Sequence, residues 1–517
     1  MMLSSRALLL VDLLLLGIGV AVALRRGPFF ASRGLRRAAV IAALALAVFS
    51  YTDGGRFVRG HFLNLHDLFH YYFSAKYAPE LGYRRLYHCT VVGLDEIDPK
   101  LHAGVSQVRS MVHYRRVAKE WFLARPDGCK RHFSPLRWQA WKRDLERFRN
   151  DLRGNFAPSL LDKGFNATPL WTWLAHPIAN ATRLEPGFRL NALGALDLAL
   201  LAAALAAIGR AFGGRSAFLV AIYLAGCWEL SEPHVRGGFL RLDWLACSLL
   251  AVACVERKRP VAAGALLAWA SGVRVVPVLL IAVLSMRTLH DLLRGAGVPR
   301  ATRRLLGSFA VSCVLLFALS LTGAAGPHAW RDFAEKIAVH DADVSPLRVG
   351  AKALATWRGE TGPEDYVGAH GEPGYRPHFV AAKRALYAQW RFVLLALALL
   401  VAMGLASWLP PGDDAAAIAL SFPIVFLLAT PTFYYYVLLA IPVAVLAART
   451  DTRWGRWGLA SLFAAAIAVH GVRHFFGFAF LANALHSAVI ALLCIVVLAL
   501  VALTRSRAPA TAPAGAA

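Results

Sequence analysis

The chain has 517 residues, of which 56 are Lys or Arg and 31 are Asp or Glu, so its formal charge is +25, yet 58% of its residues are apolar. Only 17% of the residues are charged and long stretches carry no charge, which excludes a soluble basic protein such as a nucleic-acid-binding domain. Apolar stretches of about 20 residues recur along the chain, and each can cross the roughly 30 Å hydrocarbon layer of a bilayer. The composition therefore predicts an all-α polytopic membrane protein.

Eleven full membrane spans and one re-entrant helix pair are expected. The full spans are predicted at residues 7–24, 38–52, 190–208, 216–230, 239–255, 305–325, 391–409, 415–430, 433–448, 458–476 and 484–503. Lys and Arg in short connectors mark the cytoplasmic side, so the cluster from Arg25 to Arg37 places the first connector in the cytoplasm and the N-terminus outside. Asp12 interrupts the first apolar stretch, which favours a retained anchor over a cleaved signal peptide.

This topology divides the chain into consecutive parts, two of which are long extracytoplasmic loops. The parts are an N-terminal anchor with the second span (1–52), a first outer loop (53–189), a transmembrane bundle (190–325), a second outer loop (326–390), a C-terminal bundle (391–504) and a basic tail rich in Ala and Pro (505–517). Loops of this length usually carry function or are disordered, and their aromatic content argues against disorder. We therefore expect the functional site on the outer side.

Residues 261–286 are expected to enter and leave the membrane on the same side. The segment is apolar, but basic clusters flank it at both ends, and the run from Ser271 to Arg274 with Pro277 interrupts it. Two short helices that meet at a break satisfy this pattern, and the break should line a cavity, because exposed polar backbone is costly in lipid. One ordinary span is the alternative, but it would place the later basic connectors outside.

The first outer loop contains an unusual basic and aromatic stretch at residues 105–148. Its apolar residues recur at intervals of three and four, which predicts amphipathic helices that lie on the lipid surface. A solvated basic helix is the alternative. Cys89 and Cys129 are the only cysteines of this loop, and they could form a disulfide in an oxidising compartment. No metal site is predicted from the spacing of cysteines and histidines, and no cofactor is certain, although Asp67, Glu80 and the histidines near them could bind a divalent metal.

The richest polar cluster follows the second span. It contains His66, Asp67, His70, Tyr71, Tyr72, Lys76 and Glu80. A carboxylate among histidines and a lysine can act as a general base, which contributes typically about 10²–10⁴ in rate. Helical spacing places Asp67, His70 and Tyr71 on one face. The structural alternative is that Asp67 caps the helix that starts at Leu68.

Arg274 is the second candidate site residue. A lone arginine in an apolar segment is costly unless it faces a cavity or a partner, and a guanidinium can hold a phosphate through two parallel hydrogen bonds. The alternative is a structural ion pair with Asp243 or Glu229. In the second outer loop, Trp330, Phe333, Lys336 and His340 recur at helical spacing, which fits an acceptor site or a solvated helix equally well.

In their order along the chain these residues resemble the GT-C superfamily of membrane glycosyltransferases, most of all its polyprenol-phosphate-sugar-dependent mannosyltransferase branch. The stretch Asp67-Leu-Phe-His-Tyr-Tyr-Phe-Ser-Ala75 is similar to the context of the family's catalytic Asp early in the first outer loop. The stretch 165–170, with Pro177 after it, resembles the aromatic and proline segment before the next span. Arg259-Pro-Val-Ala-Ala-Gly264, continuing to Arg274, resembles the family's Arg-Pro-x-x-Ala-Gly segment.

The resemblance implies a GT-C-like fold and a glycosyltransferase that moves a mannose-like hexose or a pentose from a polyprenyl-phosphate donor. The acceptor would be an extracytoplasmic lipid, glycan or protein, and no nucleic-acid partner is expected. Asp67 would deprotonate the acceptor hydroxyl, and Arg274, Lys76 or Arg236 would bind the donor phosphate. The expected donor or acceptor pocket contains His66, His70, Tyr71, Tyr72, Glu232, His234 and His340.

The expected location is the bacterial inner membrane, with the active site on its extracytoplasmic face. A secondary transporter is the first alternative, since transporters also place charges at broken helices, but no internal repeat is visible. A non-catalytic membrane assembly subunit is the second. Transfer of a glycan or a phospho-group from another lipid donor is a related enzymatic alternative.

Overall fold

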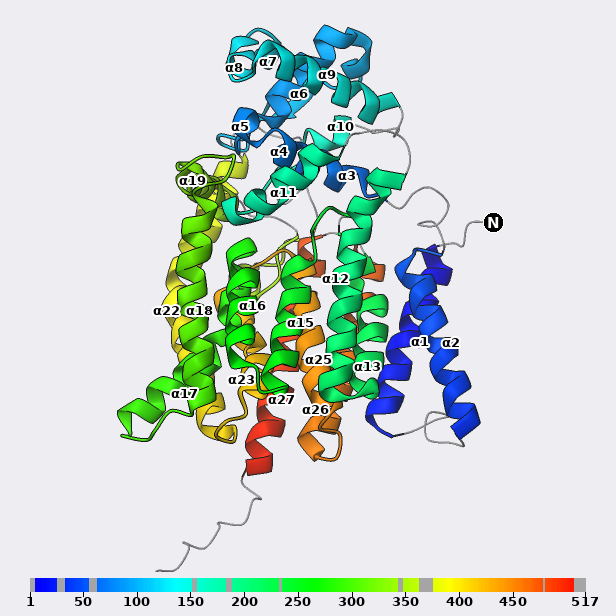
Figure 1. The fold of residues 1–517 in the computed structure, drawn as a ribbon, viewed down its shortest axis with the longest axis vertical. Coiled ribbons are helices and arrows are strands. Elements are labelled where there is room, and N and C mark those ends of the chain that lie inside the picture. The colour runs from blue at the N-terminus through cyan, green and yellow to red at the C-terminus, as the bar shows by residue number, and fades with distance from the viewer. Residues whose placement is uncertain are drawn as a thin grey trace, which may run out of the picture.

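The computed structural model describes residues 5–25, 33–54, 63–150, 156–182, 188–231, 235–342, 347–361, 375–477 and 479–505. Its regular structure is helical apart from one two-stranded sheet in the described part. Figure 1 shows a bundle of roughly parallel helices with a smaller group of helices above it. Eight of the described helices are long and apolar enough to cross a membrane, and four apolar helices are shorter. The prediction of an all-α polytopic membrane protein is confirmed, while the count of eleven full spans stays a prediction.

The bundle is built from α1, α2, α12 to α18 and α22 to α27. Their bounds are α1 (Ser5–Ala23), α2 (Arg33–Tyr51), α12 (Phe188–Phe212), α13 (Gly214–Gly226), α14 (Trp228–Ser231), α15 (Asp243–Glu256), α16 (Pro260–Val273), η4 (Val276–Ile281), α17 (Ala282–Leu293), α18 (Arg300–Ser320), α22 (Tyr375–Trp408), α23 (Asp414–Ala419), α24 (Phe422–Leu428), η5 (Phe433–Leu439), α25 (Ala440–Ala447), α26 (Arg453–Phe476) and α27 (Phe480–Arg505).

The two outer loops form the upper part of Figure 1. The first contains α3 (Leu65–Asp67), the π-helical turn η2 (Leu68–Tyr72), α4 (Phe73–Lys76), α5 (Ala78–Leu81), α6 (Leu86–Ile97), η3 (Pro99–His102), β1 (Gln107–Arg109), β2 (Arg116–Ala118), α7 (Lys119–Leu123), α8 (Asp127–Lys130), α9 (Pro135–Asn150), α10 (Phe156–Ser159) and α11 (Pro169–Ala181). Strands β1 and β2 are antiparallel, with Val108 opposite Val117. The second loop contains α19 (Ala329–Ala342) and α20 (Ala351–Thr356).

The segment predicted as a re-entrant pair forms two helices that meet at a break. Helix α16 ends at Val273, Arg274 is extended with φ −142°, and η4 with α17 leads away again. Arg274 lines a cavity at the upper end of the bundle, whereas Arg287 of α17 pairs with Asp414 at its lower end. Both ends of the pair therefore lie at the lower end. The segment from Val276 to Leu293 is itself long enough to span a membrane.

Close helix packing in the bundle depends on small residues. Gly264 of α16 faces α18 so closely that a Cβ atom on it would lie 2.3 Å from the carbonyl oxygen of Leu305. Such contacts bring two backbones together where leucine side chains could not fit, which favours association of helices in lipid. This contact holds α16, and with it Arg274, against the bundle.

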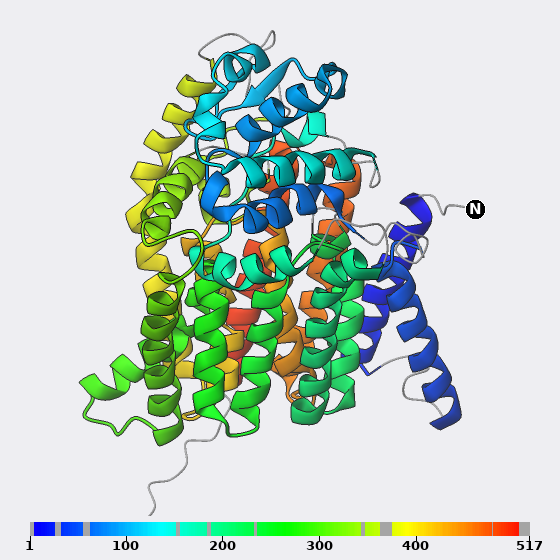
Figure 2. The ribbon, with the colours of Figure 1, turned by 45° about the horizontal axis from the view of Figure 1, so that its top comes forward.

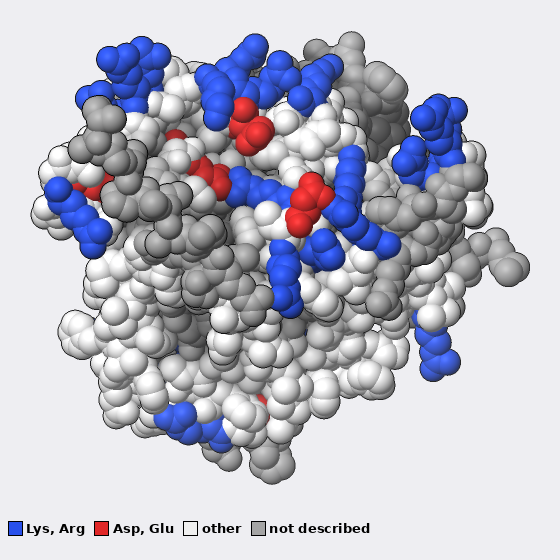
Figure 3. All heavy atoms as spheres, turned by 90° about the horizontal axis from the view of Figure 1, so that it is seen from below, with Lys and Arg blue, Asp and Glu red and all other residues white. Residues whose placement is uncertain are grey.

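Basic side chains outnumber acidic ones on the lower face of the bundle, which Figure 3 shows from below. Short connectors with exposed basic residues include the turn at Arg257 to Arg259 and the stretch from Arg294 to Arg304. This is the face that the charge pattern predicts to be cytoplasmic. The orientation in a particular membrane stays a prediction.

The basic stretch 105–148 buries most of its aromatic side chains within the protein, although Trp121 of α7 is 47% exposed. It forms the β1–β2 hairpin, α7, α8 and most of α9, and the aromatic face of α9 is buried in the outer part. The indole N–H of Trp141 donates to the carbonyl oxygen of Cys89 at 3.0 Å, and that of Trp138 donates to Glu96 at 2.9 Å. The prediction of a lipid-surface helix is wrong, because the period of three and four reflects packing of α9 onto α6.

Cys89 of α6 and Cys129 of α8 form a disulfide, with Cα atoms 5.3 Å apart and 40 residues between them in sequence. A loop closed over this length restricts the unfolded outer part, and loss of such a bridge typically costs about 2–5 kcal/mol.

We therefore expect a Cys89→Ser, Cys129→Ser double variant to expose α6 to α9 to proteolysis while the membrane bundle stays intact. Limited proteolysis followed by mass spectrometry measures this difference. Wild-type protein treated with a reductant should show the same cleavage, and equal resistance of oxidised, reduced and double-variant protein would contradict the expectation.

Candidate functional site

A cavity with about 1370 Å³ of empty space lies where the outer loops meet the bundle. Figure 2 shows the segments of the first outer loop lying across the upper end of the bundle helices. The cavity is lined by residues of α3 and η2, of the chain before α11, of the α16–η4 break, of α19 and of the segment before η5. Segments far apart in sequence therefore meet at one site at the outer end of the bundle.

Asp67 lies in the wall of this cavity and is 2% exposed. Its Oδ1 atom is 2.8 Å from Nε of Arg241, and its Oδ2 atom accepts a hydrogen bond from the backbone N–H of Phe239 at 2.9 Å. Burial raises the pKa of Asp67 to about 6, although the charge of Arg241 opposes the shift. A carboxylate with this pKa can be ionised and still accept a proton near neutral pH.

Asp67 does not cap a helix with its side chain. The N-cap of α3 is Asn64, whose Oδ1 accepts a hydrogen bond from the backbone N–H of Asp67 at 3.0 Å. The side chain of Asp67 makes no capping bond to η2. The capping interpretation of Asp67 is therefore wrong. The π-helical turn that follows is a feature found frequently at functional sites.

Two carboxylates hold the loop that carries Arg241. Asp197 of α12 accepts hydrogen bonds from the backbone N–H groups of Arg241 at 2.8 Å and Leu242 at 3.1 Å, while Asp67 holds Phe239. Leu240 between them has φ +51°, a conformation that is strained for a leucine. The loop is thus fixed by buried polar contacts, and the Arg241 guanidinium is positioned beside Asp67.

Gly238 allows this loop to approach Asp67. A Cβ atom at this position would lie 2.7 Å from Oδ2 of Asp67 and 2.4 Å from Cγ of Arg241. We expect Gly238→Ala to displace the carboxylate, to lower the transfer rate proposed below by at least about tenfold, and to cost about 1–3 kcal/mol of stability through overpacking. Turnover assays and thermal unfolding in detergent measure both effects.

Gly307 of α18 is the matched control, because a Cβ atom there would meet nothing within 4 Å. Gly307→Ala should leave turnover and unfolding temperature close to those of the wild type. Equal behaviour of the two variants would show that the close approach at Gly238 does not matter.

Arg241 and Arg274 both lie close to the ring of the cavity residue Tyr71. Their guanidinium carbons are 3.9 Å and 5.5 Å from the centre of its ring. Both arginines are buried, and Nη1 of Arg241 and Nη2 of Arg274 have no hydrogen-bond partner among the described residues. Unsatisfied buried N–H donors on positive groups are costly. An anion bound in the cavity would satisfy them.

The expected ion pair of Arg274 with Asp243 or Glu229 is absent among the described residues. Glu229 instead lies 3.5 Å from Nε2 of His486. Arg274 therefore lines the cavity without a carboxylate in direct contact, although the buried Asp243 is close enough to interact with its charge. This is the arrangement that the functional interpretation of a lone intramembrane arginine requires.

The first outer loop is tied to the α16–η4 break by Thr168. Its hydroxyl donates to the carbonyl oxygen of Gly272 at 2.7 Å and accepts from the backbone N–H of Trp171 at 3.2 Å. Thr168 is thus the N-cap of α11 and also a link to the end of α16. The two halves of the cavity wall, one in the loop and one in the bundle, are held together at this point.

Helix α19 of the second outer loop packs against the first outer loop instead of being a solvated helix. Phe333 and His340 line the cavity, and Nδ1 of His340 is 3.3 Å from the hydroxyl of Tyr114. Lys336 is 1% exposed and donates to the carbonyl oxygen of Lys163 at 2.8 Å. Burial lowers the pKa of Lys336 to about 7. The second loop therefore closes one side of the cavity.

The structure brings some of the expected pocket residues together and separates others. His66, His70, Tyr71 and His340 line the cavity with Asp67. Helical spacing predicts this shared position for Asp67, His70 and Tyr71. Tyr72 does not line it, because its hydroxyl donates to the carbonyl oxygen of Thr182 at 2.7 Å. Glu232 and His234 lie outside the described residues.

Lys76 and Arg236 are not placed to bind a phosphate in this cavity. Nζ of Lys76 lies 2.7 Å from Asp144 of α9. Arg236 donates to the carbonyl oxygens of Ser50 at 2.8 Å and Ala225 at 3.0 Å, which joins α2 to α13. Neither residue lines the cavity and each already has a structural partner, so the geometry does not support their predicted role. Arg241, which sequence reasoning did not assign to the phosphate, lines the cavity together with Arg274.

The cavity wall also holds a group of potential metal ligands that sequence reasoning missed. Ligand atoms of His66, His70 and Asp162 lie within 4.8 Å of one another. No metal site is predicted from the spacing of histidines, but that expectation overlooks that His66 and His70 are four residues apart and share a helical face. Asp162 comes from the chain after α10 and has no sequence signal that links it to them.

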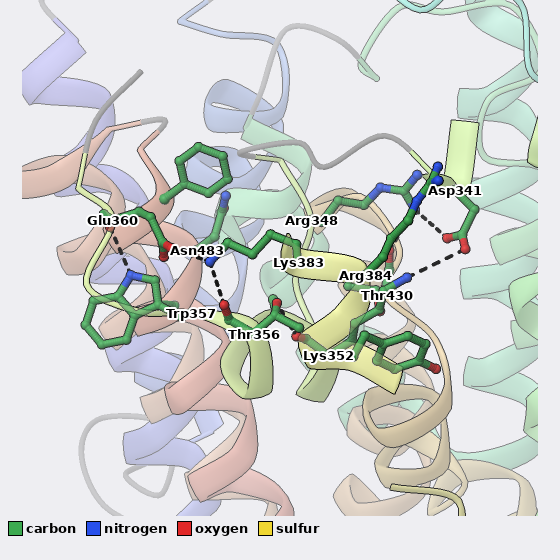
Figure 4. Close-up of a pocket in the computed structure, with 14 residues that line it drawn as sticks. Asp341, Arg348, Lys352, Thr356, Trp357, Glu360, Lys383, Arg384, Thr430 and Asn483 are labelled. Atoms are coloured by element: carbon green, nitrogen blue, oxygen red, sulfur yellow. Dashed lines mark hydrogen bonds and ion pairs between the residues drawn. The ribbon is translucent and has the colours of Figure 1, made fainter. Parts of the chain in front are cut away.

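A second cavity, with about 800 Å³ of empty space, lies between α20, α22 and α27. Figure 4 shows its basic residues Arg348, Lys352, Lys383 and Arg384 with the carboxylates Asp341 and Glu360. Lys383 pairs with Glu360, and Lys352 lies 3.6 Å from Asp341. Arg348 lines both cavities, so the second lies directly beside the first.

The residues that sequence reasoning missed, Arg241 and Asp162 among them, are brought to the cavity by tertiary contacts. A signal for Arg241 existed, since it is a charged residue in an apolar surrounding, but no local spacing relates it to Asp67. Comparison with known proteins adds no further residue: no family model matches the chain, and no curated protein or solved structure is significantly similar to it.

Proposed function

We propose that the protein is a membrane glycosyltransferase of the GT-C type that transfers a sugar from a polyprenyl-phosphate donor to a hydroxyl of an acceptor on the outer side. One observation carries the proposal. The buried carboxylate of Asp67 shares a cavity with two buried arginines, Arg241 and Arg274, whose guanidinium groups each retain an unpartnered N–H donor. A base and an anion-binding pair in one cavity are what displacement of a phosphate by a hydroxyl requires.

In this reaction the acceptor oxygen attacks the anomeric carbon of the donor. Asp67 takes the hydroxyl proton as the new carbon–oxygen bond forms, and the bond between the anomeric carbon and the phosphate oxygen breaks. The polyprenyl phosphate leaves with an additional negative charge. Arg241 and Arg274 donate hydrogen bonds to it, and these bonds strengthen as the charge develops.

The position of the cavity supports a lipid-linked donor. It lies at the end of the bundle where the helices meet the outer loops, and Val275, which lines the cavity, is itself 57% exposed. A polyprenyl chain can stay in the lipid while its phosphate enters the cavity. The acceptor can approach from the side of the outer loops, through residues of α19 and the first loop.

The proposal is tested with purified wild-type protein in lipid vesicles and a panel of synthetic radiolabelled polyprenyl-phosphate sugars. Transfer of label to an acceptor, or release of free sugar by slow hydrolysis, is the expected result. Folded protein that neither transfers nor hydrolyses any donor would contradict the proposal. Transport of a sugar across the vesicle without covalent transfer would instead favour the transporter.

A further inference from the structure

His66 and His70 are arranged on one face of the α3–η2 segment, and both line the cavity that contains Asp67. Their ring centroids are 4.5 Å apart. Two histidines four residues apart on a helical turn can present ring nitrogens to one metal ion. A third ligand is needed for a site of this kind, and it has to come from another part of the chain.

Both ring nitrogens of His70 face oxygen atoms. Nδ1 lies 2.7 Å from the backbone carbonyl oxygen of His66, which can only accept, so Nδ1 carries a proton. Nε2 lies 2.8 Å from the hydroxyl of Tyr87 and 3.3 Å from the carbonyl oxygen of Ser159, so oxygen atoms surround it. A bond from the other ring nitrogen to a carbonyl is the arrangement that orients histidines which bind metals.

Asp162 supplies the third ligand. Its Oδ2 atom is 3.8 Å from Nε2 of His70 and accepts a hydrogen bond from the backbone N–H of Gly164 at 3.1 Å. The carboxylate of Asp162, the carbonyl oxygen of Ser159 and the hydroxyl of Tyr87 thus surround Nε2 of His70. Oxygen atoms gathered in this way favour a positive charge among them, either a proton on the ring or a metal ion.

We propose that His66, His70 and Asp162 bind one divalent transition-metal ion, for which Zn²⁺ is the best match. Zinc binds imidazole nitrogen and carboxylate oxygen at about 2.0–2.2 Å, so an ion can bridge the gap of 3.8 Å between His70 and Asp162. Three protein ligands leave a fourth position for water or for an oxygen of a molecule in the cavity. This inference goes beyond the proposed transfer and does not depend on it.

Small movements complete the site. The ligand atoms lie within 4.8 Å of one another, whereas tetrahedral zinc with bonds of about 2.1 Å places them about 3.4 Å apart. His66 and Asp162 are only partly buried and can rotate toward the buried His70. The hydroxyl of Tyr87 gives up its bond to Nε2 when the metal binds.

The test uses wild-type protein purified through a tag without histidines, stripped with a chelator and titrated with ZnCl₂ by isothermal calorimetry. We expect one equivalent of zinc to bind, manganese to bind more weakly and magnesium least, because imidazole favours zinc. Zinc should also raise the unfolding temperature, a readout that works equally well for variants of lower stability.

Matched variants separate this site from adventitious histidines. His66→Ala and Asp162→Asn should each weaken zinc binding by at least about tenfold. His113→Ala removes an exposed histidine of the same outer loop and should change nothing. Tyr87→Phe frees Nε2 of His70 and should increase the affinity.

Zinc affinity that is unchanged in both His66→Ala and Asp162→Asn would overturn the inference, as would the absence of any zinc-dependent rise in unfolding temperature. Zinc affinity that is unchanged in His70→Ala would remove His70 from the ligands and overturn it as well. Because the readouts are binding and thermal stability, failure of the transferase assay leaves this result intact, and the converse also holds.

Discussion

An Asp67→Asn variant is expected to lose at least about 100-fold in transfer rate, because an amide cannot take the proton of the acceptor hydroxyl. The oxygen of the amide can still accept the backbone N–H of Phe239, so the loop that carries Arg241 keeps its contact. The rate is measured with labelled donor in vesicles at saturating acceptor. Donor affinity, measured by equilibrium binding, should stay within a few-fold of the wild type.

Asp127→Asn is the control for this result. Asp127 lies in α8 of the same outer loop, is exposed and does not line the cavity. Its substitution should leave turnover unchanged. If Asp67→Asn instead loses expression, monodispersity or donor binding together with turnover, Asp67 has a structural role and the proposed base is wrong.

An Arg274→Ala variant is the second large effect that we expect, with a loss of about 10²–10³ in transfer rate, the range for removal of one donor to a developing negative charge. The Michaelis constant for the donor should rise as well, since the phosphate is bound before reaction. Arg274→Lys keeps the charge but not the paired N–H groups, so it should recover only part of the rate.

Arg287→Ala is the matched control, because Arg287 lies on the same helix pair and both arginines are 4% exposed. Arg287 pairs with Asp414 at the opposite end of the bundle. Its loss should lower the unfolding temperature but leave turnover per folded molecule unchanged. A similar loss of turnover in both variants would mean that Arg274 acts only through stability.

The parts of the site that lie on one local segment could be predicted from the sequence. Asp67, His70 and Tyr71 share a face because helical spacing places them there, and the break at Arg274 follows from basic flanks around an interrupted apolar stretch. Both patterns depend only on residues that are close in sequence, so they do not require knowledge of how the rest of the chain folds. The overall class of the fold could be predicted for the same reason, since hydropathy is read within single spans.

Some site residues were not predicted, and others were predicted in a role that the structure does not support. The positions of both kinds depend on contacts between distant segments. Arg241 meets Asp67 because Asp197 of α12, a distant segment, holds the loop that carries Arg241, and Lys76 forms an ion pair with Asp144 of a helix far along the chain. Trp141 belongs to a helix face that packs on α6. An amphipathic pattern shows that a face is buried, but it does not say whether protein or lipid covers it.

The length of α22 indicates how deep the second cavity lies relative to the membrane. Its 34 residues make a helix about 51 Å long, which exceeds the roughly 30 Å hydrocarbon layer by about 20 Å. Its large exposed apolar side chains begin at Trp390 and Phe392, and Trp and Arg at such a boundary are typical interfacial anchors. Lys383 and Arg384 then stand above the hydrocarbon edge, so that the cavity of Figure 4 lies at the level of the lipid headgroups.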